Sequence, residues 1–375
     1  MKQTIKICIL GDVCPQWGFR ESFDKQDESL IFGDVVPELK NATFSVCNLE
    51  APASRRGKRI NKCGPCLRCN PEDLEVLKAV GINVLSMANN HILDYGKEAL
   101  LDSIDACAGC YTFGAGKNQA EAEKPLFLSE NGQTIGMISY AEEEFNGARR
   151  DSAGANLFDP YSSLPKIKRV KAICDYLIVL YHGGIEHYAL PSPLLQKKCR
   201  AMADAGADLI LCQHSHCIGT REKYHGAEIL YGQGNAIFGR RGDSAWDTGL
   251  LTTVVLSEDG NRVSYRAFSA KEQGISFLLP EENQAVLDRM DQLSQKLDDE
   301  EFIKSSWDKF CAGITPMDMP MLLGWNRIFN KLNRILKNRL VKWFMNRKKA
   351  MIAMNLIRCD SHHEVIQTIL ENMQK

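Results

Sequence analysis

The sequence predicts an α/β fold, and three observations lead to this prediction. Short apolar runs rich in β-branched residues recur through the first 256 residues, beginning with IKICIL at residues 5–10. Helical stretches separate several of these runs, and side chains that can bind metals follow them. Because strand and helix alternate along the chain, a largely parallel sheet covered by helices is expected.

Eight apolar runs are predicted to be buried strands from their length, their β-branched content and their turn-like boundaries. They span residues 5–10, 43–49, 82–88, 134–140, 176–181, 207–212, 227–232 and 250–256. The segment PEDLEVLKAVG is predicted to be a helix, with Pro71 near its start and Gly81 at its end.

The strand pattern fades after Phe268, and residues 280–300 read as a polar helix with apolar positions from Val286 to Leu297. We therefore expect a first domain at residues 1–272. A helical extension is expected at residues 273–375.

The extension contains a strongly basic segment. From residue 319 to residue 359 there are ten Lys or Arg residues and no Asp or Glu. Between Trp325 and Phe344, apolar residues recur every three or four positions with basic residues interleaved, which predicts one basic amphipathic helix. Its apolar stripe would pack on the body of the protein, lie on an anionic lipid surface, or dock on a biosynthetic partner.

Composition narrows the class of protein. With 44% hydrophobic and 25% charged residues and a net charge of -1, nothing attracts nucleic acid globally, and no nucleic-acid partner is expected. The apolar run at the N-terminus is too short for a signal peptide, and no run reaches the roughly 18 residues of a membrane span. The fourteen cysteines are scattered, as in a reducing compartment. A cytoplasmic protein is expected, and it would be peripheral to the membrane only under the lipid-surface alternative for the basic segment.

Potential metal ligands stand where the predicted strands end. They are Asp12, Glu50, Asn90, His182, His214 and His216. Ligands of open α/β sheets gather at the carboxyl ends of the strands, so these residues should converge. Carboxylate, amide and imidazole ligands suit Mn, Fe or Zn, and a pair of such ions about 3.5–4 Å apart can activate water for attack on a phosphoester. About two divalent ions are therefore predicted.

Each residue taken alone has a simpler interpretation. Asp12 could cap a turn, and His91 could be a core histidine. The segment NNHILDYG nevertheless places His91 and Asp94 three residues apart where a helix would begin, so the carboxylate could orient an imidazole that protonates a leaving group. An extended backbone at QHSH would point His214 and His216 to one side. In HGGIEHY, Glu186 is a possible further carboxylate.

Two further features lie between residues 55 and 69. Cys63, Cys66 and Cys69 have a spacing suited to zinc or an iron–sulfur cluster, although no fourth cysteine follows at a fitting distance and free thiols are the simpler interpretation. Five basic residues, Arg55, Arg56, Lys58, Arg59 and Lys62, either line a cleft for an anionic substrate or form a solvated loop.

The order of the motifs resembles the CapA family of poly-γ-glutamate capsule biosynthesis proteins, which is related to calcineurin-like metallophosphoesterases. The motifs are GD at 11–12, NLEAP at 48–52, NNHILDYG at 89–96, HGGIEHY at 182–188, GADLILCQHSH at 206–216 and GNAIF at 234–238, which adds Asn235 as a possible site residue. The resemblance covers residues 5–270.

The resemblance implies a four-layer α/β/β/α domain. It also implies that Asp12 and His216 hold one ion and that Glu50 bridges it to a second ion held by Asn90, His182 and His214. His91 would then face the substrate, with Asp94 behind it. The wider superfamily has Asp-x-His at the first motif, whereas this chain has Cys14 at the histidine position, so the thiolate would have to replace an imidazole.

Two functions follow from these patterns. The first is a metal-dependent hydrolase of capsule or exopolymer biosynthesis that acts on a phosphoester, or alternatively an amide, of an anionic or polymer-related substrate. The second is a non-catalytic assembly factor that recruits a membrane-bound polymer synthase through residues 319–359.

Overall fold

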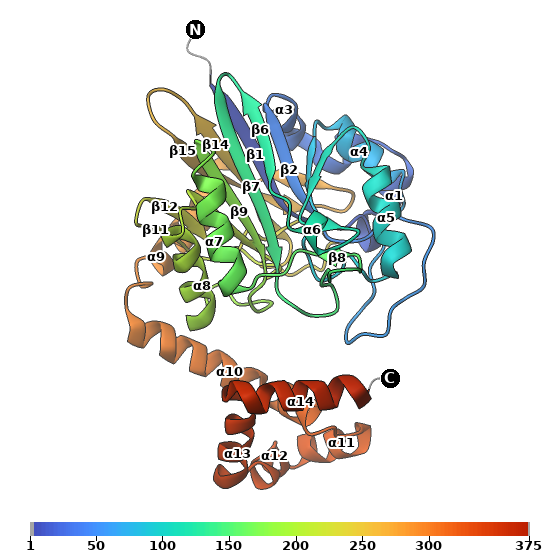
Figure 1. Ribbon diagram of the computed structural model, residues 1–375, viewed down its shortest axis with the longest axis vertical. Coiled ribbons are helices and arrows are strands. Elements are labelled where there is room, and N and C mark those ends of the chain that lie inside the picture. Colours follow the sequence, from blue (N-terminus) through green and yellow to red (C-terminus); the bar gives the residue numbers. More distant parts are fainter. Residues whose placement is uncertain (1–3, 374–375) are drawn as a thin grey trace. The chain divides into compact units, whose positions relative to one another are not determined.

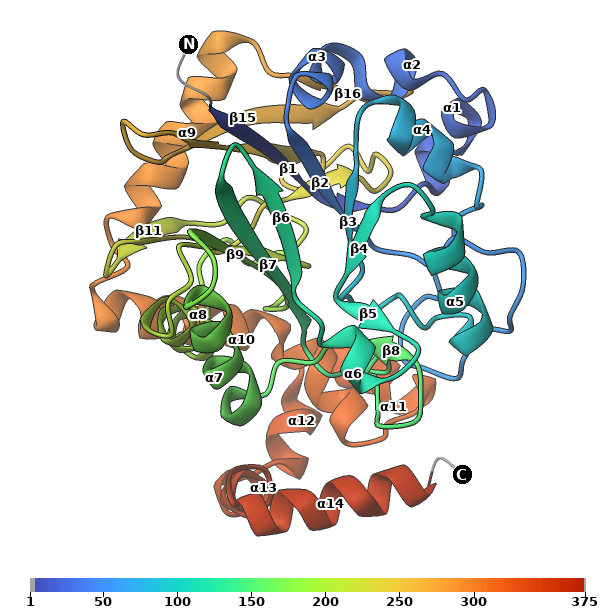
Figure 2. The ribbon, with the colours of Figure 1, turned by 45° about the horizontal axis from the view of Figure 1, so that its top comes forward.

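The computed structural model describes residues 4–373 and divides into two compact units, Met1–Ile303 and Lys304–Lys375 (Figure 1). The first unit contains two large sheets and most of the helices (Figure 2). The second unit is helical.

The first sheet has the strand order β16-β15-β14-β1-β2-β3-β4, with β13 beside β1. Strands β1 to β4 run parallel, whereas β14, β15 and β16 continue the sheet in antiparallel fashion. The bounds are β1 Ile5–Val13, β2 Phe44–Leu49, β3 Val84–Ser86, β4 Tyr111–Phe113, β13 Asn235–Ile237, β14 Thr248–Leu256, β15 Arg262–Ala270 and β16 Ile275–Phe277.

The second sheet has the order β11-β12-β10-β9-β7-β6. Its four central strands run parallel and its two edge strands pair in antiparallel fashion. The bounds are β6 Leu126–Glu130, β7 Gln133–Ala141, β9 Tyr176–His182, β10 Leu209–Gln213, β11 Arg221–Tyr224 and β12 Ala227–Leu230; a small pair joins β5 Ala115–Gly116 to β8 Gly154–Ala155.

The two sheets pack face to face and helices cover their outer faces, which confirms the four-layer α/β/β/α fold. Side chains alternate along β1: Ile7 and Ile9 enter the core between the sheets, while Cys8 and Leu10 enter the core beneath the first set of helices. This set comprises α1 Arg20–Asp24, α2 Glu28–Phe32, α3 Val36–Lys40, α4 Asp73–Ala79 and α5 Gly96–Ala106. The second sheet is covered by α7 Pro160–Lys171 and α8 Pro193–Asp204. Short elements η1 Trp17–Phe19, η2 Gly33–Val35 and α6 Gln119–Ala122 complete the layers.

All eight predicted strands are present, and the helix predicted at residues 71–81 is α4. The predicted polar helix is α9, Pro280–Ser294. Its Met290 is buried between the sheets, and Leu297 and Ile303 enter the core over the second sheet. The first compact unit therefore continues to Ile303, beyond the boundary expected at residue 272.

The C-terminal unit contains most of α10 Glu300–Leu322, followed by α11 Arg327–Ile335, α12 Arg339–Phe344, α13 Arg347–Arg358 and α14 Asp360–Met373. The prediction of one helix from Trp325 to Phe344 is wrong, because α11 ends at Ile335 and a separate helix, α12, begins at Arg339. Asn338 has a left-handed backbone with φ 62°, and the buried Asn333 side chain accepts a hydrogen bond from the Val341 N–H. Over residues 4–373, no helix has the length and apolar character that a membrane crossing requires.

Candidate metal centre

The carboxyl ends of strands from both sheets supply the candidate ligands. Asp12 near the end of β1 lies opposite Asn48 of β2, and Glu50 follows β2 directly. In the second sheet, His182 ends β9 opposite Gln213 of β10, so His214 follows immediately. Residues more than 200 positions apart in sequence therefore meet, as expected for ligands at these strand ends.

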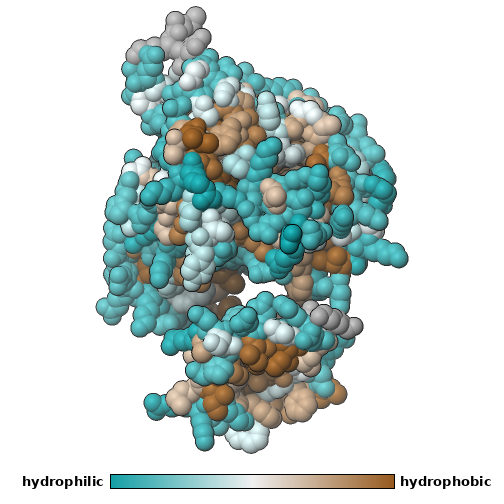
Figure 3. Space-filling model, viewed as in Figure 1, coloured by the Kyte–Doolittle hydropathy of each residue, from teal (hydrophilic) through white to brown (hydrophobic). Residues whose placement is uncertain are grey.

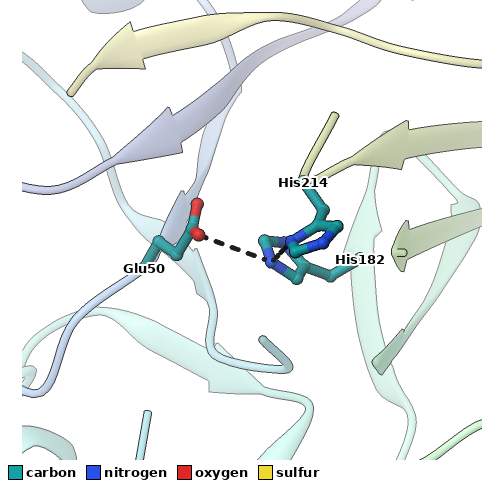
Figure 4. A group of neighbouring side chains, drawn as sticks. All are labelled: Glu50, His182 and His214. Atoms are coloured by element: carbon teal, nitrogen blue, oxygen red, sulfur yellow. Dashed lines mark hydrogen bonds and ion pairs between the residues drawn. The ribbon is translucent and has the colours of Figure 1, made fainter. Parts of the chain in front are cut away.

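Glu50, His182 and His214 form a first group, in which one potential ligand atom from each residue lies within 4.8 Å of the others (Figure 4). The His182 Nε2 atom is the centre of this group. It lies 3.2 Å from His214 Nδ1, 3.5 Å from Glu50 Oε1 and 3.1 Å from Asn90 Oδ1. One imidazole nitrogen carries at most one proton, so it cannot donate to all three neighbours at once.

Asp12, Glu50 and His216 form a second group by the same criterion, so Glu50 belongs to both groups. The Asp12 carboxylate accepts hydrogen bonds from Asn48 Nδ2 at 2.8 Å and from the His214 N–H at 3.0 Å. This arrangement reproduces the pairing that the family resemblance implies. The role of these side chains as ligands stays a prediction.

The Glu50 carboxylate is the feature that most needs a cation. Both of its oxygens are buried and neither has a hydrogen-bond partner. Burial raises the pKa of Glu50 to about 8. It raises the pKa of the fully buried Asp12 to about 7, with the Glu50 charge as the next contribution. A buried carboxylate without partners is costly, and metal coordination is one of the ways in which proteins compensate it.

The histidines do not supply the missing positive charge. Burial lowers the pKa of His182 to about 4 and that of His214 to about 3, and it holds the pKa of His216 well below its usual value. Neutral imidazoles present lone pairs, which are what a metal ion binds. Two carboxylates, neutral imidazoles and the Asn90 oxygen therefore make a donor set that fits divalent cations.

His91 and Asp94 adopt the relationship that the sequence predicts. The His91 Nδ1 and Asp94 Oδ2 atoms lie 2.6 Å apart, and His91 Nε2 lies 4.0 Å from Glu50 Oε1. The Asp94 carboxylate also receives the buried Lys62 ammonium at 2.6 Å. However, residues 91–95 form a turn and α5 begins only at Gly96, so the pair precedes the helix.

The backbone at QHSH differs from the expectation. His214 and His216 both have left-handed conformations, with φ of 86° and 52°, so the prediction of an extended backbone is wrong. The two imidazoles still reach the same region because β10 ends at Gln213 and the chain turns there. Left-handed conformations are uncommon for residues other than glycine and occur often at functional sites.

The additional candidates lie outside the two groups. Cys14 is buried, and its pKa is raised well above the usual value by burial; within residues 4–373, neither group includes its thiol. Glu186 is exposed beside His187. The Asn235 side chain instead contacts His216 Nδ1 at 2.8 Å and donates to the Trp246 carbonyl, so it orients this imidazole.

Among the described residues, Cys63, Cys66 and Cys69 belong to neither metal group. Cys63 is exposed and Cys69 is buried. In the basic loop, Arg55 pairs with Glu72 and Arg56 with Asp102. These partners account for part of the positive charge that was expected to face a cleft.

Sequence reasoning missed several supporting residues. Asn90 Nδ2 donates to Glu144, which directs the amide oxygen of Asn90 toward His182. Glu142 accepts hydrogen bonds from Tyr181 and from the Gly184 N–H, where φ is 106°. Both glutamates belong to AEEE at the end of β7, so the rule used for the other strand ends would have found them.

Comparison with known proteins agrees with the motif order. A family model described as "Bacterial capsule synthesis protein PGA_cap" matches residues 6–240. The PGA biosynthesis protein CapA of Bacillus subtilis is 29% identical over 250 residues, which cover 65% of this chain and 64% of that protein. The capsule biosynthesis protein CapA of Bacillus anthracis is 27% identical over 255 residues, covering 65% and 61%. The alignments therefore span less than two thirds of these relatives.

Among solved structures, a hypothetical protein from Thermus thermophilus is similar with a TM-score of 0.47 and 13% identity, covering 71% of this chain and 100% of that chain. A novel phosphatase from Mycoplasma pneumoniae has a TM-score of 0.46 and 14% identity, covering 71% and 94%. Since the family model covers more than half of the sequence, the chain belongs to the PGA_cap family of bacterial capsule synthesis proteins, the CapA family that its motifs indicate.

Proposed function

We propose that this chain is a metal-dependent hydrolase of capsule biosynthesis that cleaves a phosphoester in an anionic, polymer-related substrate. The observation that carries the proposal is Glu50, whose two buried oxygens lack hydrogen-bond partners and which belongs to both ligand groups. A carboxylate shared between two groups is the arrangement that would bridge two ions.

The proposed ligands are Asn90, His182 and His214 for one position, Asp12 and His216 for the other, and Glu50 between them. Two divalent cations of the Mn, Fe or Zn type would lower the pKa of a bound water and neutralise charge on a phosphoryl group. The protein contributes by holding these ligands at strand ends and by keeping the imidazoles neutral.

His91 is proposed to deliver a proton to the leaving group. Asp94 accepts from His91 Nδ1 and fixes the ring, which leaves Nε2 directed toward the Glu50 side of the site at 4.0 Å. Lys62 holds the other oxygen of Asp94 at 2.6 Å, so that the carboxylate stays in place. A general acid needs this kind of fixed orientation.

An arginine-lined pocket is proposed to receive the anionic part of the substrate. It has a volume of about 310 Å³ and includes Pro15, two residues after β1, and Tyr95, next to Asp94. Arg59 Nε donates to the Tyr95 hydroxyl, and the Arg68 guanidinium lies 4.3 Å from the Tyr95 ring centroid. Neither contact neutralises the arginine charge, so both guanidinium groups can attract an anion.

Metal content and hydrolysis of an aryl phosphodiester, measured on the same samples, test the proposal. The wild type is expected to contain about two equivalents of transition metal and to hydrolyse the ester. His214→Ala and Asn90→Ala should lose hydrolysis, whereas His225→Ala, on an exposed histidine paired with Asp204, should retain it. A folded wild type without metal or hydrolysis would contradict the proposal.

A second function is favoured by two relatives from Mycobacterium tuberculosis, each named a probable polyglutamine synthesis accessory protein and 28% identical over 223 residues. In this alternative the metal centre is a scaffold and residues 319–359 recruit a membrane-bound polymer synthase. Protein that binds the metals fully but hydrolyses no phosphoester would support the alternative over the hydrolase.

A further inference from the structure

The C-terminal unit exposes many more large apolar side chains than the first unit. Among the described side chains, seventeen are exposed in the C-terminal unit, whereas the far larger first unit exposes eight, on separate elements. Figure 3 shows a continuous apolar area within the helical unit. Contiguous apolar surface of this kind is unusual for a protein facing water and marks an interaction site.

Ten of the exposed apolar side chains of this unit lie within the basic segment, and we name this set the tail surface. It comprises Ile328, Phe329, Leu332, Ile335, Leu336, Trp343, Met351, Ile352, Met354 and Ile357. These residues lie on or directly beside α11, α12 and α13.

Helix α11 separates apolar from basic side chains. One side carries Ile328, Leu332 and Ile335, and another carries Arg327, Lys331 and Arg334. Within each set the spacing is three or four residues, which places its members on one helix face. The helix is therefore amphipathic, and both of its faces are exposed.

The apolar side chains of the tail surface are exposed although the helices that carry them are joined and capped by specific polar contacts. The Asn333 side chain joins α11 to α12 by accepting from the Val341 N–H and donating to Asn338 Oδ1. The Asn326 side chain caps α11, and that of Asn346 caps α13. Polar contacts thus fix the helices, and the apolar side chains are left for another surface.

The basic segment that carries the tail surface, residues 319–359, contains charges of one sign only. All ten Lys and Arg residues between residues 319 and 359 are exposed, and within the described chain none forms an ion pair with a carboxylate. Trp343 is 71% exposed and stands beside Lys342. Tryptophan with neighbouring lysine is typical of the boundary between lipid headgroups and acyl chains.

Other occupants fit less well. A second copy of the tail surface would bring two sets of ten positive charges together without any carboxylate between residues 319 and 359. The exposed apolar side chains of the first unit, such as Ile173 and Leu194, are dispersed and offer no matching area. An anionic surface with an apolar interior matches both the charge and the hydropathy.

We propose that the tail surface binds an anionic lipid bilayer, with α11, α12 and α13 lying in the headgroup layer. The apolar side chains would enter the acyl boundary while the basic side chains meet the lipid phosphates. Binding would be peripheral, in keeping with the lack of a spanning helix among the described residues. The inference is independent of the hydrolase proposal, since no proposed ligand belongs to this unit.

Sedimentation of the intact chain with vesicles tests this proposal. Vesicles of phosphatidylglycerol and phosphatidylcholine in a roughly 1:3 ratio should sediment the protein, and vesicles of phosphatidylcholine alone should not. Raising the salt from about 0.1 M to about 1 M should weaken binding, because surface charges are screened.

A charge variant measures the electrostatic part. Lys331→Gln, Arg334→Gln and Lys348→Gln together should weaken vesicle binding about 100-fold, roughly 5-fold for each charge. The matched control is Lys124→Gln, Lys197→Gln and Lys223→Gln, which removes the same charge from exposed positions of the first unit and should leave binding unchanged.

An apolar variant measures insertion. Ile328→Ser, Leu332→Ser and Ile335→Ser should reduce binding by more than about tenfold, because their apolar surface no longer leaves water. These side chains are exposed, so the helices should keep their circular dichroism signal. Ile173→Ser, Leu194→Ser and Leu279→Ser form the control and should bind like the wild type.

Three results would overturn the proposal. The first is a wild type that ignores anionic vesicles. The second is equal binding to neutral and anionic vesicles. The third is a dimer in gel filtration that the apolar variant dissociates while vesicle binding is absent, which would assign the tail surface to a second copy.

Discussion

The two ligand groups that share Glu50 differ in how far the protein itself already satisfies them. In the second group, Asp12 accepts two hydrogen bonds, and His216 is held by Asn235 and packs against the rings of both Phe238 and Trp246 at centroid distances of 4.6 Å. These contacts fix the geometry of the group. They also mean that the Asp12 oxygens already accept hydrogen bonds from the protein, which leaves fewer lone pairs for a cation.

The first group has more unsatisfied capacity. Asn90 Oδ1, Glu50 Oε1 and His214 Nδ1 all lie close to His182 Nε2, and this nitrogen carries at most one proton to share with them. The difference suggests that a cation contributes more to this group, which should bind the tighter of two ions. The second position should exchange its ion more readily.

Glu50→Gln should produce the largest effect, because it removes the carboxylate that both groups share. Hydrolysis of an aryl phosphodiester should fall by about 1,000-fold or more, in line with the several kcal/mol that a metal centre supplies. Steady-state kinetics and metal analysis measure it, with Glu130→Gln on the exposed end of β6 as the control. Retention of both ions would show that the groups are independent.

His214→Ala and His216→Ala separate the two positions. Loss of a direct ligand should weaken metal binding by more than about 100-fold at its own position. We expect His216→Ala to retain about one equivalent of metal after dialysis and His214→Ala to retain less. Equal metal content in the two variants would remove the proposed asymmetry.

The pH dependence of stability tests the carboxylates. Glu50 and Asp12 have folded-state pKa values of about 8 and about 7, above those of an unfolded chain, so their contribution is full at low pH and is lost as the pH rises through these values. The buried histidines have depressed pKa values, so they make the free energy of unfolding depend on pH only below about pH 6.5. Between about pH 6.5 and 8, metal-free protein should lose roughly 1 kcal/mol per pH unit.

Urea denaturation in the presence of a chelator measures this slope. Added metal should reverse the trend, because it binds the deprotonated carboxylates. A free energy of unfolding that does not change with pH in the metal-free protein would mean that the pKa values of Glu50 and Asp12 are not raised by folding.

Asn235→Ala should have the smallest effect and should confine it to one group. Loss of a side chain that orients a ligand weakens metal binding by about 10- to 100-fold. Only the ion of the Asp12 and His216 position should be affected, as a calorimetric titration with Mn²⁺ or Zn²⁺ can resolve. Equal weakening at both positions would indicate that the groups are coupled through more than Glu50.

The apolar runs indicated the central strands because those strands are buried on both faces, whereas the arrangement of two sheets in four layers was expected only from the family resemblance. Runs such as YLIVLY at residues 176–181 are continuously apolar, and this is the pattern of a central parallel strand. The antiparallel continuation of the first sheet through β14 and β15 was not foreseen, since strand pairing depends on contacts distant in sequence.

The site could be assembled from the rule that ligands follow strand ends, and Asp12, Glu50 and His182 were all found in this way. The left-handed backbone at His214 and His216 could not be found, because nothing in QHSH requires it. Likewise, Lys62 is one of several basic residues in its loop, and only the fold shows that it is buried against Asp94.

In the C-terminal unit the amphipathic pattern predicted helical structure correctly but not the break. In sequence, Asn333 and Asn338 are compatible with the polar face of a helix and also with a turn. In the structure they are hydrogen-bonded to each other, and this contact stabilises the turn. Local pattern therefore indicates the helices, while side-chain contacts determine where each of them ends.

Anomalous scattering from crystals soaked with Mn²⁺ or Zn²⁺ tests the central claim most directly, since it locates each ion. We predict two peaks on either side of the Glu50 carboxylate, the stronger one among Asn90, His182 and His214 and the weaker one between Asp12 and His216. Peaks elsewhere, or a Glu50 carboxylate without any ion, would contradict the shared two-ion centre.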